Sequence, residues 1–319
     1  MNYTAVIRTL GTAGEKYQKL LDSLCAQTLQ PREIIVYIAD GYPNPKETCG
    51  RERYVTVKKG MVAQRALPYD EVDTEYILFL DDDVYLPKDG VERLFDELNK
   101  NNADVISPDV FPNHERPLLS EIMMTLSGRM RARRLDRKWG YKVMKTCGYS
   151  YNKYPKAGAY FSQTNAGPCF FCRKDTFLKV HFEDELWLDK TSYPMGEDQI
   201  MFYKMHLMGL KVMTLYDSKI RHLDAGSTLV NLDKEKKMVE ADYFFRTVFW
   251  DRFIQSPESN AIKRLWNKVC INYFFGFGLV MSRFKGDKEM LAIKKQAIAK
   301  GREFLTSEEY RNLPKIEKK

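Results

Sequence analysis

Short apolar runs that alternate with helical stretches constrain the fold of this chain more than any other feature. The runs at 4–8, 33–40 and 75–80 are continuous, as expected for strands that are buried on both faces of a sheet. Residues 14–31 and 87–101 instead carry apolar side chains at helical spacing. With weaker elements between and after them, the order is strand, helix, strand, strand, short helix, strand, helix, strand. It predicts an α/β fold with an open, mostly parallel sheet flanked by helices.

The weaker elements are a strand at 53–60, a short helix at 61–68 and a strand at 103–111. In the second half, 167–180 predicts a strand that enters a helix, and 196–212 predicts a helix with Ile200, Met201, Met205 and Met208 on one face. From residue 231 to residue 319 the pattern is mainly helical. We therefore expect one α/β domain over 1–230 and a helical C-terminal extension over 231–319.

Three consecutive aspartates follow the apolar run at 76–80. In open α/β sheets, ligands bind outside the carboxyl ends of the strands, and Asp40 ends another predicted strand in the same way. Adjacent carboxylates repel one another, and a bound Mg²⁺ or Mn²⁺ removes that cost. If the segment stays extended, Asp81 and Asp83 share one face and Asp82 points elsewhere. The alternative is a solvated acidic turn.

The positive charge of the chain is concentrated in one segment. The whole chain has a formal net charge of +8, and residues 129–156 hold ten Lys or Arg against one acid, Asp136. We expect an anionic partner at this segment, with a solvated loop as the alternative. No recognised nucleic-acid-binding motif accompanies it, so a nucleic-acid-binding protein is not favoured.

Targeting and redox signals are few. The N-terminus has no basic region followed by a long apolar stretch, and no window reaches the roughly 18 apolar residues of a spanning helix. We therefore expect a cytoplasmic protein, with peripheral contact at the inner face of the plasma membrane left open.

The six cysteines are too scattered for a disulfide framework. Cys169 and Cys172 are interpreted as buried thiols in a strand, with a redox or metal pair as the alternative.

Several segments, taken in chain order, resemble the family 2 glycosyltransferases, which are inverting, nucleotide-sugar-dependent enzymes with the GT-A fold. The segments are SLCAQTLQPREIIVYIADG, KKGMVAQRA, LFLDDDV, GPCFFCRKDTF, GEDQIMFYKMHLMGLKV and IRHLDAGST. The resemblance covers residues 3–230. It implies a Rossmann-like sheet with a nucleotide and metal half at 1–112 and an acceptor half at 113–230.

The resemblance also implies a divalent cation, Mn²⁺ or Mg²⁺, at the three aspartates, which match the family's DxD motif. Asp83 is the first candidate for the metal ligand. Asp81 is directed to the ribose or shares the metal, and Asp82 faces the donor sugar. His222 follows a short predicted strand and is placed near the metal or a phosphate, with a structural histidine as the alternative.

Asp198 is the candidate general base, because inversion in one displacement needs a carboxylate that accepts the proton of the acceptor hydroxyl. The resemblance assigns this role to the aspartate of the Glu-Asp pair, and Glu197 then positions the acceptor or supports the site. The alternative is that Glu197 and Asp198 only cap the helix that they begin.

Four further residues are candidates for nucleotide binding. Asp40 would accept a hydrogen bond from a base edge, with a turn-forming Asp-Gly as the alternative. Arg65 would pair with the base or the diphosphate, with a surface arginine as the alternative. Arg8 and Thr9, at the end of the first predicted strand, would touch the nucleotide.

The predicted function is transfer of a sugar from a nucleoside-diphosphate sugar, taken as UDP-linked, to a hydroxyl of a glycan or a lipid-linked acceptor. An anionic acceptor would meet residues 129–156. The resemblance places the reaction in bacterial surface polysaccharide synthesis. A Mg²⁺-dependent sugar-phosphate nucleotidyltransferase is the alternative. The aromatic residues of 231–319 suit membrane-surface attachment and packing on the catalytic domain equally well.

Overall fold

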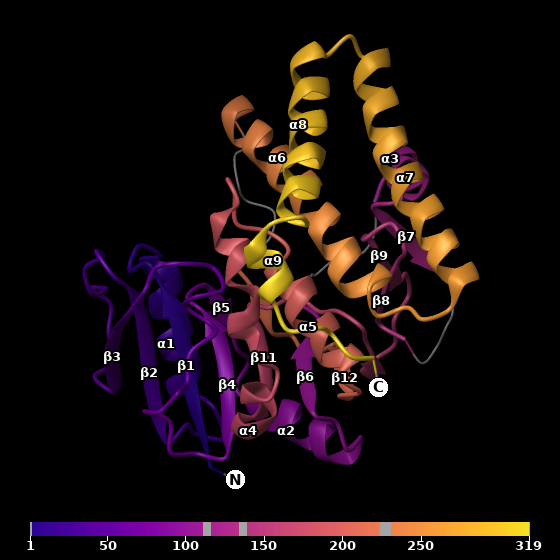
Figure 1. Cartoon of the computed structure of the whole chain (residues 1–319). Coiled ribbons are helices and arrows are strands. Elements are labelled where there is room, and N and C mark those ends of the chain that lie inside the picture. The colour runs from indigo at the N-terminus through magenta and orange to yellow at the C-terminus, as the bar shows by residue number, and fades with distance from the viewer. Residues whose placement is uncertain (1, 111–115, 134–138, 224–230, 319) are drawn as a thin grey trace.

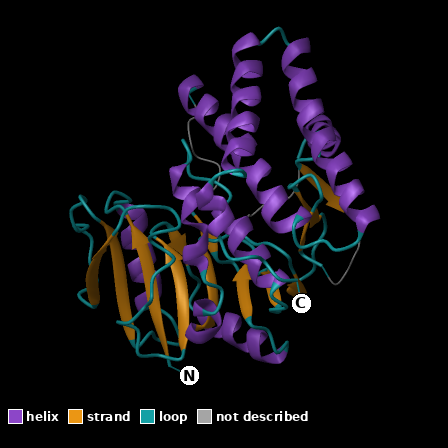
Figure 2. Ribbon diagram, viewed as in Figure 1, coloured by secondary structure: helices purple, strands orange, loops and turns teal. Residues whose placement is uncertain are grey.

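The centre of the molecule is an eight-stranded sheet with helices on both faces (Figures 1 and 2). The computed structural model describes residues 2–110, 116–133, 139–223 and 231–318. The strand order across the sheet is β10 (Gly158–Phe161), β12 (Val212–Tyr216), β6 (Val105–Pro108), β11 (Cys169–Arg173), β4 (Tyr76–Asp81), β1 (Tyr3–Thr9), β2 (Glu33–Ala39) and β3 (Glu52–Val57). Only β10 and β11 run against the others. The mostly parallel α/β sheet is therefore confirmed.

Alternate residues of each central strand enter two different hydrophobic clusters. In β4, Ile77 and Phe79 belong to one cluster, whereas Leu78 and Leu80 belong to the other. The strands carry apolar residues without interruption because both faces are buried, and burial of this surface is the main favourable term in folding.

The two faces are covered by different parts of the chain. One face is covered by α1 (Glu15–Cys25) and α2 (Gly90–Lys100), which bury Leu20, Leu21, Leu24, Val91, Leu94 and Leu98 in the second cluster. The opposite face is covered by α4 (Lys174–Leu178), the 3₁₀ helix η1 (Phe182–Lys190), α5 (Glu197–Leu207) and helices from the C-terminal region.

The C-terminal region completes this second covering layer. It consists of α6 (Leu232–Phe249), the π-helix η2 (Trp250–Gln255), α7 (Ala261–Phe284), α8 (Lys288–Phe304) and α9 (Glu308–Asn312). Phe245, Phe249, Phe274 and Ile298 lie in the same cluster as Phe79 of the sheet. Much of the aromatic content of this region is thus used in packing on the sheet. Within the described residues, no helix is long and apolar enough to cross a bilayer.

Smaller elements complete the fold. β5 (Val84–Tyr85) pairs antiparallel with β13 (Arg221–His222), and this pairing brings His222 to the end of β4. The basic segment supplies a three-stranded sheet of β7 (Met130–Arg133), β9 (Tyr149–Asn152) and β8 (Tyr141–Val143), which adjoins α3 (Leu118–Leu126). The predicted residues Arg134, Arg137 and Lys138 lie outside the described part of the chain.

Three local predictions need correction. Residues 61–68 form turns instead of a helix, and the carboxylate of Asp189 accepts hydrogen bonds from the amides of Val62 and Ala63 at 2.7 and 2.9 Å. α5 has no single apolar face, because it lies between the sheet and the C-terminal helices and is buried almost all round. Asp82 and Asp83 form a turn, so the extended alternation ends at Asp81.

The interpretation of Cys169 and Cys172 as buried thiols is confirmed. Both lie in β11 and are fully buried, with free thiols. They belong to different hydrophobic clusters, so their side chains lie on opposite faces of the sheet. A metal or disulfide shared between them is excluded by this geometry.

Glu185 of η1 joins the C-terminal region to the layer that covers the central sheet, because its partners are Arg252 of η2 and Lys204 of α5. Its carboxylate is fully buried and accepts hydrogen bonds from Arg252 Nε and Nη2, both at 2.8 Å, while Lys204 Nζ lies 3.1 Å away. Burial alone would raise the pKa of Glu185, but Arg252 and Lys204 outweigh it and hold the pKa below the ordinary value of 4.5.

This pairing predicts a pH-dependent contribution to stability. Glu185→Gln should lower the free energy of unfolding by about 3 kcal/mol near neutral pH, because the buried guanidinium of Arg252 loses its counter-charge, whereas Lys204 keeps Asp184 as a partner at 2.9 Å. The contribution is complete above pH 4.5 and is lost as pH falls from 4.5 toward the lowered pKa of the folded state, since the unfolded chain takes up the proton first. Urea unfolding of wild type and variant across this range measures the difference.

The control is Glu309→Gln, which removes an exposed pair with Lys190. It should cost less than about 1 kcal/mol at any pH. A difference between wild type and Glu185→Gln that stays constant down to pH 3 would contradict the predicted linkage.

Candidate active site

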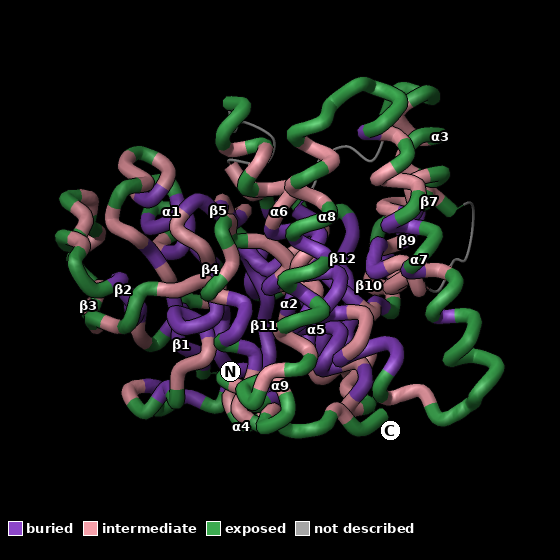
Figure 3. The backbone as a smooth tube through the Cα atoms, turned by 45° about the horizontal axis from the view of Figure 1, so that its top comes forward, coloured by how far each residue is buried: buried purple, intermediate pink, exposed green. Residues whose placement is uncertain are grey.

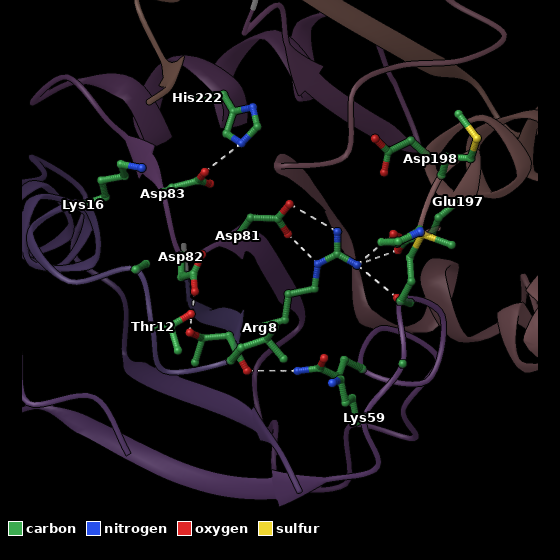
Figure 4. Close-up of a pocket in the computed structure, with 18 of the residues that line it drawn as sticks. Arg8, Thr12, Lys16, Lys59, Asp81, Asp82, Asp83, Glu197, Asp198 and His222 are labelled. Carbon is green, nitrogen blue, oxygen red and sulfur yellow. Dashed lines mark hydrogen bonds and ion pairs between the residues drawn. The ribbon is translucent and has the colours of Figure 1, made fainter. Parts of the chain in front are cut away.

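A cavity of about 640 Å³ opens at the carboxyl ends of β1 and β4, opposite the N-terminus of α5 (Figure 4). It brings together eight of the predicted site residues, which are Arg8, Thr9, Asp81, Asp82, Asp83, Glu197, Asp198 and His222. They come from four separate parts of the chain. The strand-end crevice expected for an open α/β sheet is therefore present.

Strand register places the first ion pair of the site. Arg8 of β1 lies directly beside Asp81 of β4, and both side chains point to the face of the sheet that α5 covers. Arg8 Nε lies 2.5 Å from Asp81 Oδ1, and its Nη1 lies 2.7 and 2.9 Å from the two carboxylate oxygens of Glu197. One guanidinium thus joins two strands to the first residue of α5.

Arg65 makes a second bridge behind the cavity wall. Its side chain is 3% exposed, and Nη2 donates to Asp81 Oδ1 at 3.2 Å and to the carbonyl of Gly167 at 3.0 Å. Its Nη1 lies 3.1 Å from Glu197 and 3.2 Å from Asp198. Arg65 does not line the cavity, and in this arrangement it holds the acidic residues instead of facing the opening.

The buried charges perturb one another in opposite directions. Burial raises the pKa of Asp81, but Arg8 and Arg65 outweigh it, so the pKa lies below its ordinary value. For Glu197, burial exceeds the effect of the same arginines and the pKa is raised. The pKa of Arg8 is raised well above its ordinary value by Asp81 and Glu197, against the opposing effect of burial. The Arg8 guanidinium therefore stays charged.

The other two aspartates have different partners. Asp82 accepts a hydrogen bond from the hydroxyl of Thr9, and burial with repulsion from Asp81 and Asp83 raises its pKa to about 6. Asp83 lies 2.9 Å from Nε2 of His222, and both residues face the cavity. Of the three aspartates, Asp83 is the one that lies beside His222. Together, Asp83 and His222 present an oxygen and a nitrogen that could act as metal ligands.

Asp198 and the glycines around it define the far wall. The Asp198 side chain is 38% exposed and faces the cavity from the first turn of α5. Gly196 begins this helix with φ of 82°, and a Cβ there would enter the ring of Phe245. Glycine is therefore required both for the left-handed backbone and for the close approach of α6.

The residues that could hold a metal are fewer than the sequence suggested. Among the described residues, no group of three His, Cys, Asp or Glu side chains is arranged to hold a metal ion. The Asp81 carboxylate is engaged by Arg8 and Arg65 and does not join Asp83 and His222. Mg²⁺ bound to a diphosphate typically needs only one or two protein ligands, so the Asp83–His222 pair remains chemically sufficient.

Asp40 lies apart from this cavity. It is exposed after β2 and lines a separate shallow hollow with Thr56, Val57, Lys58 and Lys59. Lys59 lines both hollows, so the two are neighbours.

Sequence reasoning missed several residues of the cavity wall. Thr12, Lys16 and Lys59 line it, and Figure 4 shows Lys16 on the same side as Asp83 and His222. The signal was the stretch IRTLGTAGEKY, which resembles a lysine-bearing phosphate loop only faintly. Lys16 follows Gly14 in the first turn of α1, which brings its ammonium to the strand ends.

Comparison with known proteins identifies part of the chain. Residues 14–152 match the family model described as glycosyl transferase family 2. This stretch is less than half of the chain, and it is similar to that family. The match contains Asp40, Arg65 and Asp81 to Asp83. It ends before Glu197, Asp198 and His222, so the assignment of these three depends on the geometry of the cavity and on the resemblance of their sequence segments.

The fold of the chain is similar to that of solved structures. The chain is similar to the crystal structure of GalNAc-T7 with UDP, GalNAc and Mn²⁺, with a TM-score of 0.51 and 14% sequence identity. The similarity covers 85% of this chain, which spans about half (54%) of that protein. The likeness supports the GT-A type of fold. No curated protein sequence matches the chain significantly.

The ion network around Arg8 predicts a stability effect. Arg8→Ala should lower the free energy of unfolding by about 2–3 kcal/mol, because Asp81 and Glu197 lose one of the two arginines that pair with them. The value is below that of a fully buried pair, since the Arg8 side chain is 20% exposed. Arg53→Ala, which removes an exposed partner 3.6 Å from Glu33, should cost less than about 1 kcal/mol. Chemical denaturation measures both, and equal costs would contradict the network.

Proposed function

We propose that the protein is a glycosyltransferase that moves a sugar from a nucleoside-diphosphate sugar, with UDP as the nucleotide, to a hydroxyl of a glycan or a lipid-linked acceptor. The observation that carries the proposal is the single cavity that faces the three aspartates and His222 on one side and Asp198 on the other. The family match over 14–152 supports the same activity. By analogy with the family, we extend the proposal to bacterial surface polysaccharide synthesis.

In this proposal, residues 1–112 bind the nucleotide-sugar donor and the metal, and residues 113–230 bind the acceptor. Thr9, Asp81 and Asp82 would contact the ribose and the donor sugar from the ends of β1 and β4. Lys16 and Lys59 add positive charge to the same wall, which favours a diphosphate. Asp40 would reach the base from the neighbouring hollow, which shares Lys59 with the cavity.

A divalent cation fits the donor set of Asp83 and His222, because Mn²⁺ and Mg²⁺ accept carboxylate oxygens and Mn²⁺ also accepts imidazole. When bound, the cation would neutralise the charge that develops on the departing nucleoside diphosphate. The GalNAc-T7 crystal structure contains Mn²⁺ together with UDP and GalNAc, which is in line with a metal-assisted donor site in that fold.

Asp198 is the proposed general base of an inverting displacement. Its side chain faces the cavity and is partly exposed, so an acceptor hydroxyl can approach it from solvent. Glu197 is 4% exposed and is held by Arg8 and Arg65, so its proposed role is to position α5 and the base. Nη1 of Arg65 donates to Asp198 Oδ1 at 3.2 Å from behind the cavity wall and so holds the carboxylate in place.

Donor binding tests the proposal directly. Isothermal titration with UDP and GDP, with and without Mn²⁺, should show metal-dependent binding of UDP. Asp83→Ala should weaken it by about 10–100-fold, because a ligand of the cation is lost. Asp96→Ala, an exposed aspartate of α2, is the matched control and should bind as wild type does. Absence of binding to either nucleotide would overturn the donor site.

The chemical step is tested with Asp198→Asn. This change should lower kcat by about 10²–10⁴-fold, because the amide cannot accept the proton, while UDP binding by titration stays within about twofold of wild type. The measurement is nucleotide release from the UDP-sugar that supports turnover. Release of UDP from the UDP-sugar supports glycosyl transfer, whereas release of pyrophosphate from UTP and a sugar 1-phosphate would support the nucleotidyltransferase alternative. Loss of UDP binding together with kcat would instead assign Asp198 to the donor site.

A further inference from the structure

α7 packs on the protein with one face and leaves the opposite face uncovered. The packed face contains Asn267, Ile271, Phe274, Phe275 and Ser282. The uncovered face carries large apolar side chains at spacings of three, four or seven residues, and these are Ile262, Leu265, Trp266, Val269, Tyr273, Val280 and Phe284. Ile262 is 80% exposed and Phe284 is 85% exposed. The exposed apolar side chains therefore form a continuous stripe along the helix.

α3 extends this stripe. The helix has no buried residue, and Leu118, Leu119, Ile122, Met123 and Leu126 are all exposed. The hydroxyl of Tyr273 donates to the carbonyl of Leu126 at 2.5 Å, so the two helices lie side by side. Figures 1 and 3 show them together at one end of the molecule, away from β1 to β3. We call the exposed apolar side chains of α3 and α7 the α3–α7 face.

Positive charge borders the α3–α7 face. α7 contains four basic residues and no acidic residue, and Lys263, Arg264, Lys268 and Arg283 are all exposed. β7 lies against α3 and exposes Arg131 and Arg133, which alternate with Ala132 and so share one side of the strand. Two other basic residues of the segment are paired with acids, since Arg129 lies 2.7 Å from Asp242 and Lys153 lies 2.6 Å from Glu121.

We propose that the α3–α7 face docks on an anionic lipid bilayer, with α7 lying in the plane of the headgroups. A contiguous apolar patch of this extent on an exposed surface marks an interaction site. Amphipathic helices that combine apolar residues, Trp and flanking Lys or Arg bind membrane interfaces by burying the apolar face among the acyl chains. The surrounding Lys and Arg side chains complement anionic headgroups, and each adds favourable electrostatic binding energy near the membrane surface.

The arrangement favours a membrane surface over a spanning segment or an ordinary protein contact. No helix in the described part of the chain can cross a bilayer, so α7 would lie on the membrane. Trp266 and Tyr273 point outward from α7, and these residue types are enriched at membrane–water interfaces. The docking itself does not depend on the proposed activity. If that activity holds, docking would keep the enzyme at the surface where a lipid-linked acceptor resides.

Vesicle co-sedimentation of the full chain tests the proposal, with vesicles of phosphatidylcholine alone and of phosphatidylcholine mixed with phosphatidylglycerol. Wild type should bind the mixed vesicles, and binding should weaken as salt rises. The double variant Trp266→Ser with Phe284→Ser should bind at least about tenfold more weakly, because two large apolar anchors are lost. Lys263→Glu with Lys268→Glu should also bind at least about tenfold more weakly, through charge repulsion.

The matched control is Leu232→Ser on α6, where an apolar side chain of similar exposure lies outside the face. It should bind vesicles as wild type does. Tryptophan fluorescence gives an independent readout, since the emission should shift to shorter wavelength with anionic vesicles in wild type and not in the variant that lacks Trp266. UDP titration and thermal unfolding establish that each variant remains folded, and they keep failure of docking separate from failure of the donor site.

Three outcomes would overturn the proposal. The first is that wild type does not bind the mixed vesicles. The second is that neither double variant weakens binding while the control matches wild type. The third is that wild type is a dimer in solution that Trp266→Ser with Phe284→Ser converts to a monomer, because the face would then be covered by a second copy of the chain.

Discussion

The buried ion network around Arg8 is the interaction on which the site depends. It joins residue 8 of β1, residue 81 of β4 and residue 197 of α5, so it fixes elements that are far apart in the chain against one another. Charges removed from water are costly unless each has a partner at hydrogen-bonding distance, and Arg8 and Arg65 supply that partner to every acid they touch. The cavity is therefore shaped by electrostatic pairing as much as by apolar packing.

The three consecutive aspartates illustrate how one motif is divided among different tasks. The end of β4 turns after Asp81, so the three side chains separate toward Arg8, Thr9 and His222. An arginine partner keeps Asp81 ionised, whereas burial beside two acids favours the protonated form of Asp82. A run of identical residues thus presents three chemically distinct carboxylates to one cavity.

Periodicity in the sequence was sufficient to predict the sheet and its flanking helices, because strands that are buried on both faces leave an unmistakable apolar run. It failed for α5, whose surroundings come from helices far along the chain, and for residues 61–68, whose turns depend on Asp189. The motif resemblance predicted ten site residues, and eight of them line one cavity in the structure. It could not distinguish these residues from Arg65, which supports the cavity wall from behind. Lys16 was overlooked because a single lysine near a glycine carries little information.

The two faces of the sheet become complete at different stages of synthesis. Among the residues that the structure describes, the cluster under α1 and α2 contains none beyond Ile220, whereas the opposite cluster includes Phe274 and Ile298. Domains generally fold as units while the chain is being synthesised, and synthesis adds roughly 5–20 residues per second. A nascent chain that has released all eight strands of this sheet would still lack the C-terminal helices that complete one covering layer. The side chains of Trp187 and Tyr203, which pack on Phe244 and Phe249 of α6, would stay exposed until those helices leave the ribosome. The emerging chain therefore offers chaperones a transient apolar surface that is buried in the folded molecule.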